Sequence, residues 1–185
     1  MRNRLEVMTM PDSKLTELRK LMGQRNKILY EAVKAGRAAD LPPEDQAMAR
    51  AVSEHMHLRH VHNALEFADL REGETYEIEV DGNAVSPIAH LVMHATVKSQ
   101  VEADPQVRAA FEKLVATGSS AHQAEHILAF LFTGLYFEMT NPGNTDTEVE
   151  NARVVYYRRI KRITLHAAYR KKLTRQFRDD HLGFG

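Results

Sequence analysis

The chain has 185 residues, no cysteine, and equal numbers of acidic and basic residues, 25 of each. A chain of this length forms one domain of ordinary size, and without cysteine it has neither disulfides nor thiolate metal sites. Any metal ion must therefore be held by nitrogen and oxygen atoms. No stretch approaches the ~20 apolar residues of a membrane span, and the N-terminus does not resemble a signal peptide. We therefore expect a cytoplasmic protein with no membrane contact.

The two kinds of charge are unevenly distributed along the chain. Residues 151–178 contain ten Lys or Arg and no Asp or Glu. Residues 1–150 contain 15 basic and 23 acidic residues, a balance of −8. This pattern predicts a helical domain over residues 1–145, followed by a basic helical extension over residues 146–185.

The first predicted helix runs from Asp12 or Ser13, either of which can cap its start, to about Ala35. Gly36 suits the residue that ends a helix, because glycine adopts the left-handed conformation without strain. Gly23 is unfavourable in the middle of such a helix.

Two prolines then interrupt the chain, and apolar periodicity predicts a second helix over residues 44–70. A helical wheel places His55 and His62 on its inner face, with Glu66 one turn after His62. The other two histidines of this segment are predicted to face solvent: His57 and His60.

Residues 75–80 alternate between polar and apolar, which is typical of a strand. The dipeptide Asp81-Gly82 favours a tight turn, and Ala84-Val85 forms a short return arm. We expect a small hairpin packed on a helical body, because two strands alone are only marginally stable.

The next segment predicts the central helix of the fold, over residues 87–103. Ser86 can cap its start, and Pro87 suits its first position. His90 and His94 lie four residues apart, so their imidazoles share one face. Because this helix is apolar on both sides, we expect it to be buried, and buried imidazoles need partners.

Two further helices are predicted over residues 105–117 and about 121–139, separated by Gly118 and capped by Asp104 and by Ser119 or Ser120. The second is apolar nearly all round but has three polar residues on one face near its start: His122, Glu125 and His126.

A break at residues 141–144 precedes a long basic helix from about Asp146 to Arg178. The predicted fold class is all-α, a mostly antiparallel helical bundle with a small β-hairpin and a long basic C-terminal helix.

Inward-facing histidines and glutamates on three helices predict a metal site. In the absence of sulfur, imidazole and carboxylate groups favour zinc, iron, nickel or manganese. We expect His90 and His94 to chelate one ion, as a histidine pair four residues apart can do. The further candidate ligands are, in order of preference, His126, His55, Glu125 and His122. Glu125 is also a candidate catalytic base or a group that orients a ligand, which would suit a metal-dependent hydrolase or a redox enzyme.

Two other interpretations remain open. The histidines can instead form a buried hydrogen-bond network in a structural domain. The basic helix can mark a non-enzymatic interaction protein that binds nucleic acid or a protein partner. Because no base-reading motif accompanies the charge, we favour a helix that neutralises the acidic body of its own chain or of a second subunit in a homo-oligomer.

Several short segments over residues 27–140 resemble a bacterial family called domain of unknown function 1841: Leu41-Pro42-Pro43-Glu44, Glu54-His55, Ser86-Pro87-x-x-His90-x-x-x-His94, Gln100, Asp104-Pro105 and His122-x-x-Glu125-His126. The family typically has Asn-Pro where this chain has Ser86-Pro87. It has His-Pro-Glu-Tyr-His where this chain has His55-Met56-His57-Leu58-Arg59-His60, so the second histidine is out of register. The resemblance supports the choice of residues but implies no activity, because the family has none assigned.

Overall fold

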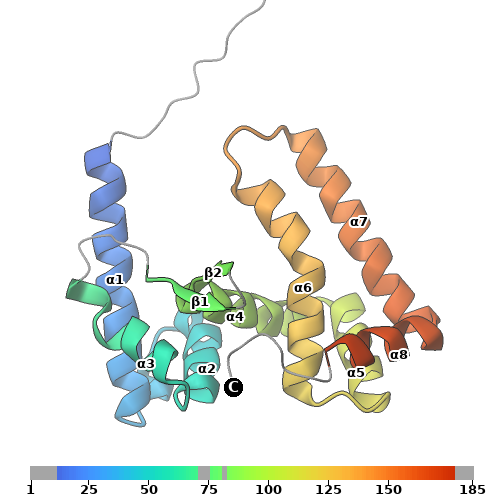
Figure 1. The fold of residues 1–185 in the computed structure, drawn as a ribbon, viewed down its shortest axis with the longest axis horizontal. Helices are drawn as coiled ribbons and strands as arrows, with labels where there is room; N and C mark the ends of the chain where they lie inside the picture. Colours follow the sequence, from blue (N-terminus) through green and yellow to red (C-terminus); the bar gives the residue numbers. More distant parts are fainter. Residues whose placement is uncertain (1–11, 71–75, 81–82, 178–185) are drawn as a thin grey trace, which may run out of the picture.

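The computed structural model describes residues 12–70, 76–80 and 83–177 (Figure 1). Its α-helices are α1 (Asp12–Lys34), α2 (Gln46–His55), α3 (Arg59–Glu66), α4 (Pro87–Ala103), α5 (Pro105–Ala116), α6 (Ala121–Thr140), α7 (Asp146–Leu165) and α8 (Ala167–Gln176). Short 3-10 turns lie at Ala38–Asp40, Pro43–Asp45 and Ala68–Leu70. The all-α fold class is confirmed. None of the described helices is long and apolar enough to cross a membrane.

The predicted hairpin is present and short. Strand β1 (Ile78–Val80) pairs antiparallel with β2 (Asn83–Val85), and Ile78 lies opposite Val85. The predicted turn at residues 81–82 lies outside the described residues.

Helix α4 lies across the middle of the molecule, between α1–α3 on one side and α5–α8 on the other (Figure 1). The Ser86 hydroxyl accepts a hydrogen bond from the amide of Ala89, and Pro87 occupies the first turn, as predicted. Leu91 packs into a hydrophobic cluster with α1, α2 and α3, whereas Val97 packs into a second cluster with α5, α6, α7 and α8. The prediction of a central helix is confirmed.

The predicted helix over residues 44–70 is wrong. The segment divides into α2 and α3, because Leu58 adopts an extended backbone conformation and turns its side chain into the first cluster. The change of direction removes His62 from the face that carries His55. As predicted, His57 is exposed, but His60 is half-buried.

The single long C-terminal helix is also wrong. The chain bends at His166, whose backbone is extended, and continues as α8. The Arg170 guanidinium donates to the carbonyl oxygens of Ile163, at 2.6 Å, and Thr164, at 3.2 Å. These bonds satisfy carbonyls that the end of α7 leaves without helical partners.

The basic C-terminal helices pack into the same hydrophobic cluster as α5 and α6. Tyr156, Ile160 and Ile163 from α7 and Leu173 from α8 are all buried there. Helices α6 and α7 lie side by side and run antiparallel (Figure 1). The predicted boundary at residue 145 falls in the turn between them and stays a prediction.

The fold explains the glycine in the middle of α1. A Cβ atom at Gly23 would clash with the backbone carbonyl of Ala68, in the 3-10 turn that follows α3. Gly23 therefore lets this turn approach the α1 backbone, and the helix tolerates its unfavourable propensity for that reason.

We expect Gly23→Ala to lower the free energy of unfolding by about 1–3 kcal/mol, because a clash with backbone outweighs the gain in helix propensity. Gly134→Ala in α6 is the matched control, since nothing lies within 4 Å of its Cβ position. That variant should gain up to about 1 kcal/mol. Urea denaturation of both variants tests this, and equal gains would contradict the close approach.

Candidate metal centre

Five histidines converge where α2, α4 and α6 meet. His55 is the last residue of α2, His90 and His94 come from α4, and His122 and His126 come from α6. The ring centroid of His94 lies 4.5 Å from that of His55, 4.7 Å from that of His90 and 4.8 Å from that of His126. The structure therefore brings together the histidines that the sequence placed on three separate helices.

Four of these side chains could share one ion. His55, His90, His94 and His126 each offer a ring nitrogen, and these nitrogens lie within 4.8 Å of one another. His94, His122 and Glu125 form a second, overlapping group with the same spacing. In both groups all but one of the side chains are buried, and His90 and His122 are half-buried.

The hydrogen bond that His55 makes to the backbone fixes which of its nitrogens presents a lone pair. Its Nδ1 lies 2.7 Å from the carbonyl oxygen of Ala51. A carbonyl oxygen only accepts, so Nδ1 carries the proton and Nε2 presents its lone pair. Nε2 of His90 lies 3.3 Å from Nε2 of His55, at hydrogen-bonding distance. Two imidazoles bound to a tetrahedral zinc ion, with Zn–N distances of about 2.05 Å, have nitrogens about 3.3 Å apart.

His94 is oriented by a carboxylate. Its Nδ1 donates to Oε2 of Glu125 at 2.8 Å, so its Nε2 also presents a lone pair. Within the part of the chain that the structure describes, this buried Nε2 has no hydrogen-bond partner. A closed hydrogen-bond network among the histidines would satisfy this atom, because unpaired buried polar atoms are costly. The contact between His55 and His90 is such a hydrogen bond, but it does not extend to Nε2 of His94, which is left open to a ligand.

Both oxygens of Glu125 are engaged. Nζ of Lys98 lies 2.6 Å from Oε1 of Glu125 and 3.0 Å from Oε1 of Glu54. Burial alone would lower the pKa of Lys98, but its hydrogen bonds and ion pairs with the two glutamates outweigh burial and raise it. Lys98 is thus an ammonium ion that holds Glu125 against His94. Among the roles predicted for Glu125, this geometry favours orienting a ligand over acting as a ligand or a base.

The histidines from α4 are neutral at physiological pH. Burial, with a smaller contribution from neighbouring imidazoles, lowers the pKa of His90 and of His94 to about 2. Burial also lowers the pKa of His55, against the opposing effect of its bond to Ala51. Neutral imidazole is the form that binds a metal ion, so these residues need no deprotonation before binding.

His62 and Glu66, which were predicted to face inward, lie outside the histidine cluster. Nε2 of His62 is 2.8 Å from the hydroxyl of Tyr30, and its Nδ1 is 3.2 Å from Oε2 of Glu66. Conversely, Lys98 was not predicted. Lys98 lies one turn after His94, and this spacing places it on the same face of α4. The spacing did not identify Lys98, because lysine is not a metal ligand and the sequence does not show that Glu125 is its partner.

In the metal-free protein, acid should destabilise the fold through His90 and His94. Their pKa is about 2 when folded and near 6.5 when unfolded, so the unfolded chain takes up protons first as the pH falls. Stability is therefore complete above about pH 6.5 and is lost below it, by up to about 1.4 kcal/mol per pH unit for each histidine. Denaturation curves between pH 8 and pH 5 measure this effect. His57→Gln, which changes an exposed histidine, should leave the profile unchanged, and a flat profile below pH 6.5 would contradict the burial of neutral imidazoles.

The sequence model of the family described as Domain of unknown function (DUF1841) matches residues 21–150. The match is more than half of the chain, and it includes all six candidate ligands as well as Glu54 and Lys98. No curated protein and no solved structure matches the chain. The chain therefore belongs to the Domain of unknown function (DUF1841) family.

Proposed function

We propose that this protein binds one divalent transition-metal ion through ring nitrogens of His55, His90, His94 and His126. The observation that carries the proposal is the buried Nε2 of His94, which presents a lone pair to three other imidazoles and has no other partner among the described residues. Burying such an atom is unfavourable unless something binds it.

The ligand set limits the choice of metal. Four neutral imidazoles suit zinc, iron or nickel, whereas manganese prefers oxygen ligands and suits this set least. Because neutral imidazoles add no negative charge, a bound ion would keep its full positive charge. That charge would make it an effective Lewis acid.

The reaction that such an ion would serve depends on its coordination. If all four imidazoles bind, the site is closed and stabilises the junction of the helices. If three bind, one position stays open for a substrate, as in catalytic zinc sites. His90 and His122 are half-buried, so the site is not sealed from solvent on their side. Zinc or nickel would favour a hydrolase, and iron would favour a redox enzyme.

Elemental analysis of untagged protein tests the proposal. We expect about one zinc, iron or nickel ion per chain, and loss of the ion in the double variant His90→Ala, His94→Ala. The matched control is His57→Ala, His166→Ala, which removes two exposed histidines and should keep the ion. Circular dichroism would establish that each variant is folded. Unchanged metal content in the first variant would show that the assignment is wrong, as would metal-free protein that also refuses added zinc, iron and nickel.

The orienting role of Glu125 makes a separate prediction. We expect Glu125→Ala to weaken metal affinity by about 10- to 100-fold while one ion still binds at saturation, because loss of a group that orients a ligand has effects of this size. Competition with a chromogenic chelator measures the affinity. Glu54→Ala is the control, since it removes the other carboxylate on Lys98 but leaves His94 paired, and its affinity should change less than threefold. Complete loss of binding in Glu125→Ala would instead identify Glu125 as a ligand.

A further inference from the structure

Among the described residues, the basic side chains of the C-terminal helices form no ion pair with the acidic residues of α1–α6. Within the described part of residues 151–178, the one ion pair is between Arg153 and Glu150, which lie on the same helix. The inner face of α7 is apolar, so its cations point outward. The expectation that this segment neutralises its own chain is therefore not supported by its contacts.

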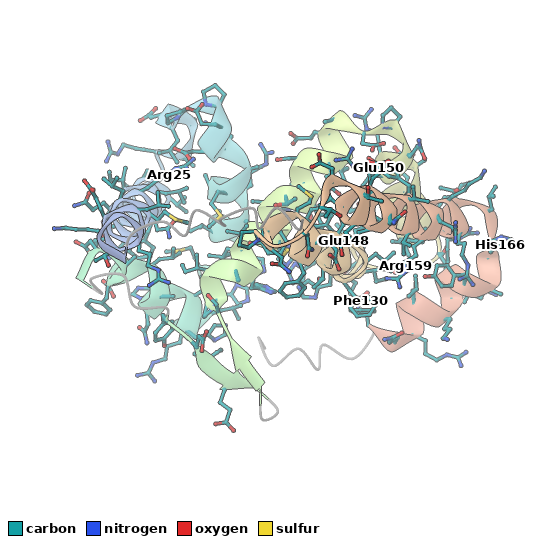
Figure 2. The ribbon with its side chains drawn as sticks, turned by 90° about the horizontal axis from the view of Figure 1, so that it is seen from above. Arg25, Phe130, Glu148, Glu150, Arg159 and His166 are labelled. Carbon is teal, nitrogen blue, oxygen red and sulfur yellow. The ribbon has the colours of Figure 1, made fainter. Side chains whose placement is uncertain are left out.

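Charge is separated along α7. Figure 2 shows Glu148 and Glu150 in its N-terminal half, Arg159 farther along and His166 at its end. Four exposed cations lie in its C-terminal half: Arg158, Arg159, Lys161 and Arg162. Arg158 lies three or four residues, about one turn or 5.4 Å, before Lys161 and Arg162. No acidic residue follows Glu150 on this helix.

Helix α8 adds a small cationic pocket. A cavity of about 190 Å³ is lined by Lys171 and Arg175, one turn apart on α8, and by Thr174 and Thr117. Arg170 fixes the position of α8 by donating to the Thr117 hydroxyl at 3.1 Å and to the end of α7. Neither Lys171 nor Arg175 forms an ion pair within the described residues, so both charges are available to an anion.

We propose that the surface of α7 and α8 binds the phosphodiester backbone of a nucleic acid, with one phosphate in the pocket formed by Lys171, Arg175, Thr117 and Thr174. Lysine and arginine side chains are groups that contact phosphate oxygens. The Thr117 hydroxyl already donates to the carbonyl oxygen of Lys113, and the Thr174 hydroxyl is hydrogen-bonded to Ser119, so the threonines line the pocket while the two cations hold the phosphate. Because no base-reading motif accompanies them, binding is independent of base sequence.

The surface chemistry favours a polyanion over a protein partner. A protein interface has an apolar core within a polar rim. The exposed apolar residues of α7 are too few to form such a core: Val154, Val155 and Leu165. Cationic side chains lie among them. The balance of −8 over residues 1–150, which include the acidic start of α7, would repel a polyanion there, and so restricts the contact to α8 and the C-terminal half of α7.

The test is fluorescence anisotropy of the full chain with two labelled probes, a 30-nucleotide single-stranded RNA and a DNA duplex of equal length, between 50 and 200 mM KCl. We expect the triple variant Lys171→Ala, Lys172→Ala, Arg175→Ala to raise Kd at least tenfold at 50 mM KCl. The slope of log Kd against log salt concentration for the duplex should fall by about 1 to 2, since the variant removes the shared pocket phosphate and at most one contact at Lys172, and each lost phosphate contact accounts for about 0.9. The control, Arg19→Ala, Lys20→Ala, Arg37→Ala, removes as many exposed cations from the other side of α4 and should change Kd less than twofold.

Four results would overturn the proposal. The first is no binding of either probe at micromolar protein in 50 mM KCl. The second is equal weakening by the triple variant and its control. The third is displacement of the probe by millimolar inorganic phosphate but not by KCl of equal ionic strength, which would assign the pocket to an isolated phosphate. The fourth is a wild-type dimer in light scattering that the triple variant dissociates without any nucleic-acid binding, which would assign the surface to a second copy of the chain.

Discussion

The imidazoles of His55, His90 and His94 can lie together between two hydrophobic clusters only while they are neutral or bound to a cation. Each charged imidazole there would face the loss of hydration and the repulsion of its neighbours, which is why the pKa values of His90 and His94 fall so far. The cluster is also where α2, α4 and α6 meet. Protonation of its histidines or binding of a cation therefore affects how the two halves of the molecule are joined. A divalent ion among neutral imidazoles would give the buried Nε2 of His94 a partner and would connect the three helices.

A series of ion pairs and hydrogen bonds centred on Lys98 supports this junction of apolar and imidazole side chains. Lys98, from α4, binds Glu54 of α2 and Glu125 of α6, and Glu125 in turn fixes the tautomer of His94. The same ammonium therefore ties together the three helices that supply the histidines. Orientation of a ligand by a carboxylate is the arrangement that metal sites with histidine commonly use. The contacts of Glu125 thus support both the fold and the proposed site.

Short sequence patterns predicted the elements that depend only on interactions between residues close together in the chain. The capping of α4 by Ser86 and Pro87, the apolar faces of α4 and the turn before α7 all follow from neighbouring residues. The break at Leu58 does not, because it depends on burial against α1, and neither does the bend at His166, which Arg170 stabilises. The helical wheel correctly placed His55, His90 and His94 inward, but it failed for His62 because it assumed one continuous helix. Spacing along a helix gives direction but not distance, so it could not separate His122 from His126 or reveal Lys98.

Anomalous diffraction from crystals of the metal-loaded protein, recorded on both sides of the absorption edge of the bound element, tests the central claim most directly. We expect one peak at the junction of α2, α4 and α6, about 2.0–2.1 Å from Nε2 of His55 and of His94, with further nitrogen ligands from His90 and His126. A peak bound instead at exposed His57 or His166, or no peak in crystals grown with zinc, iron or nickel, would contradict it.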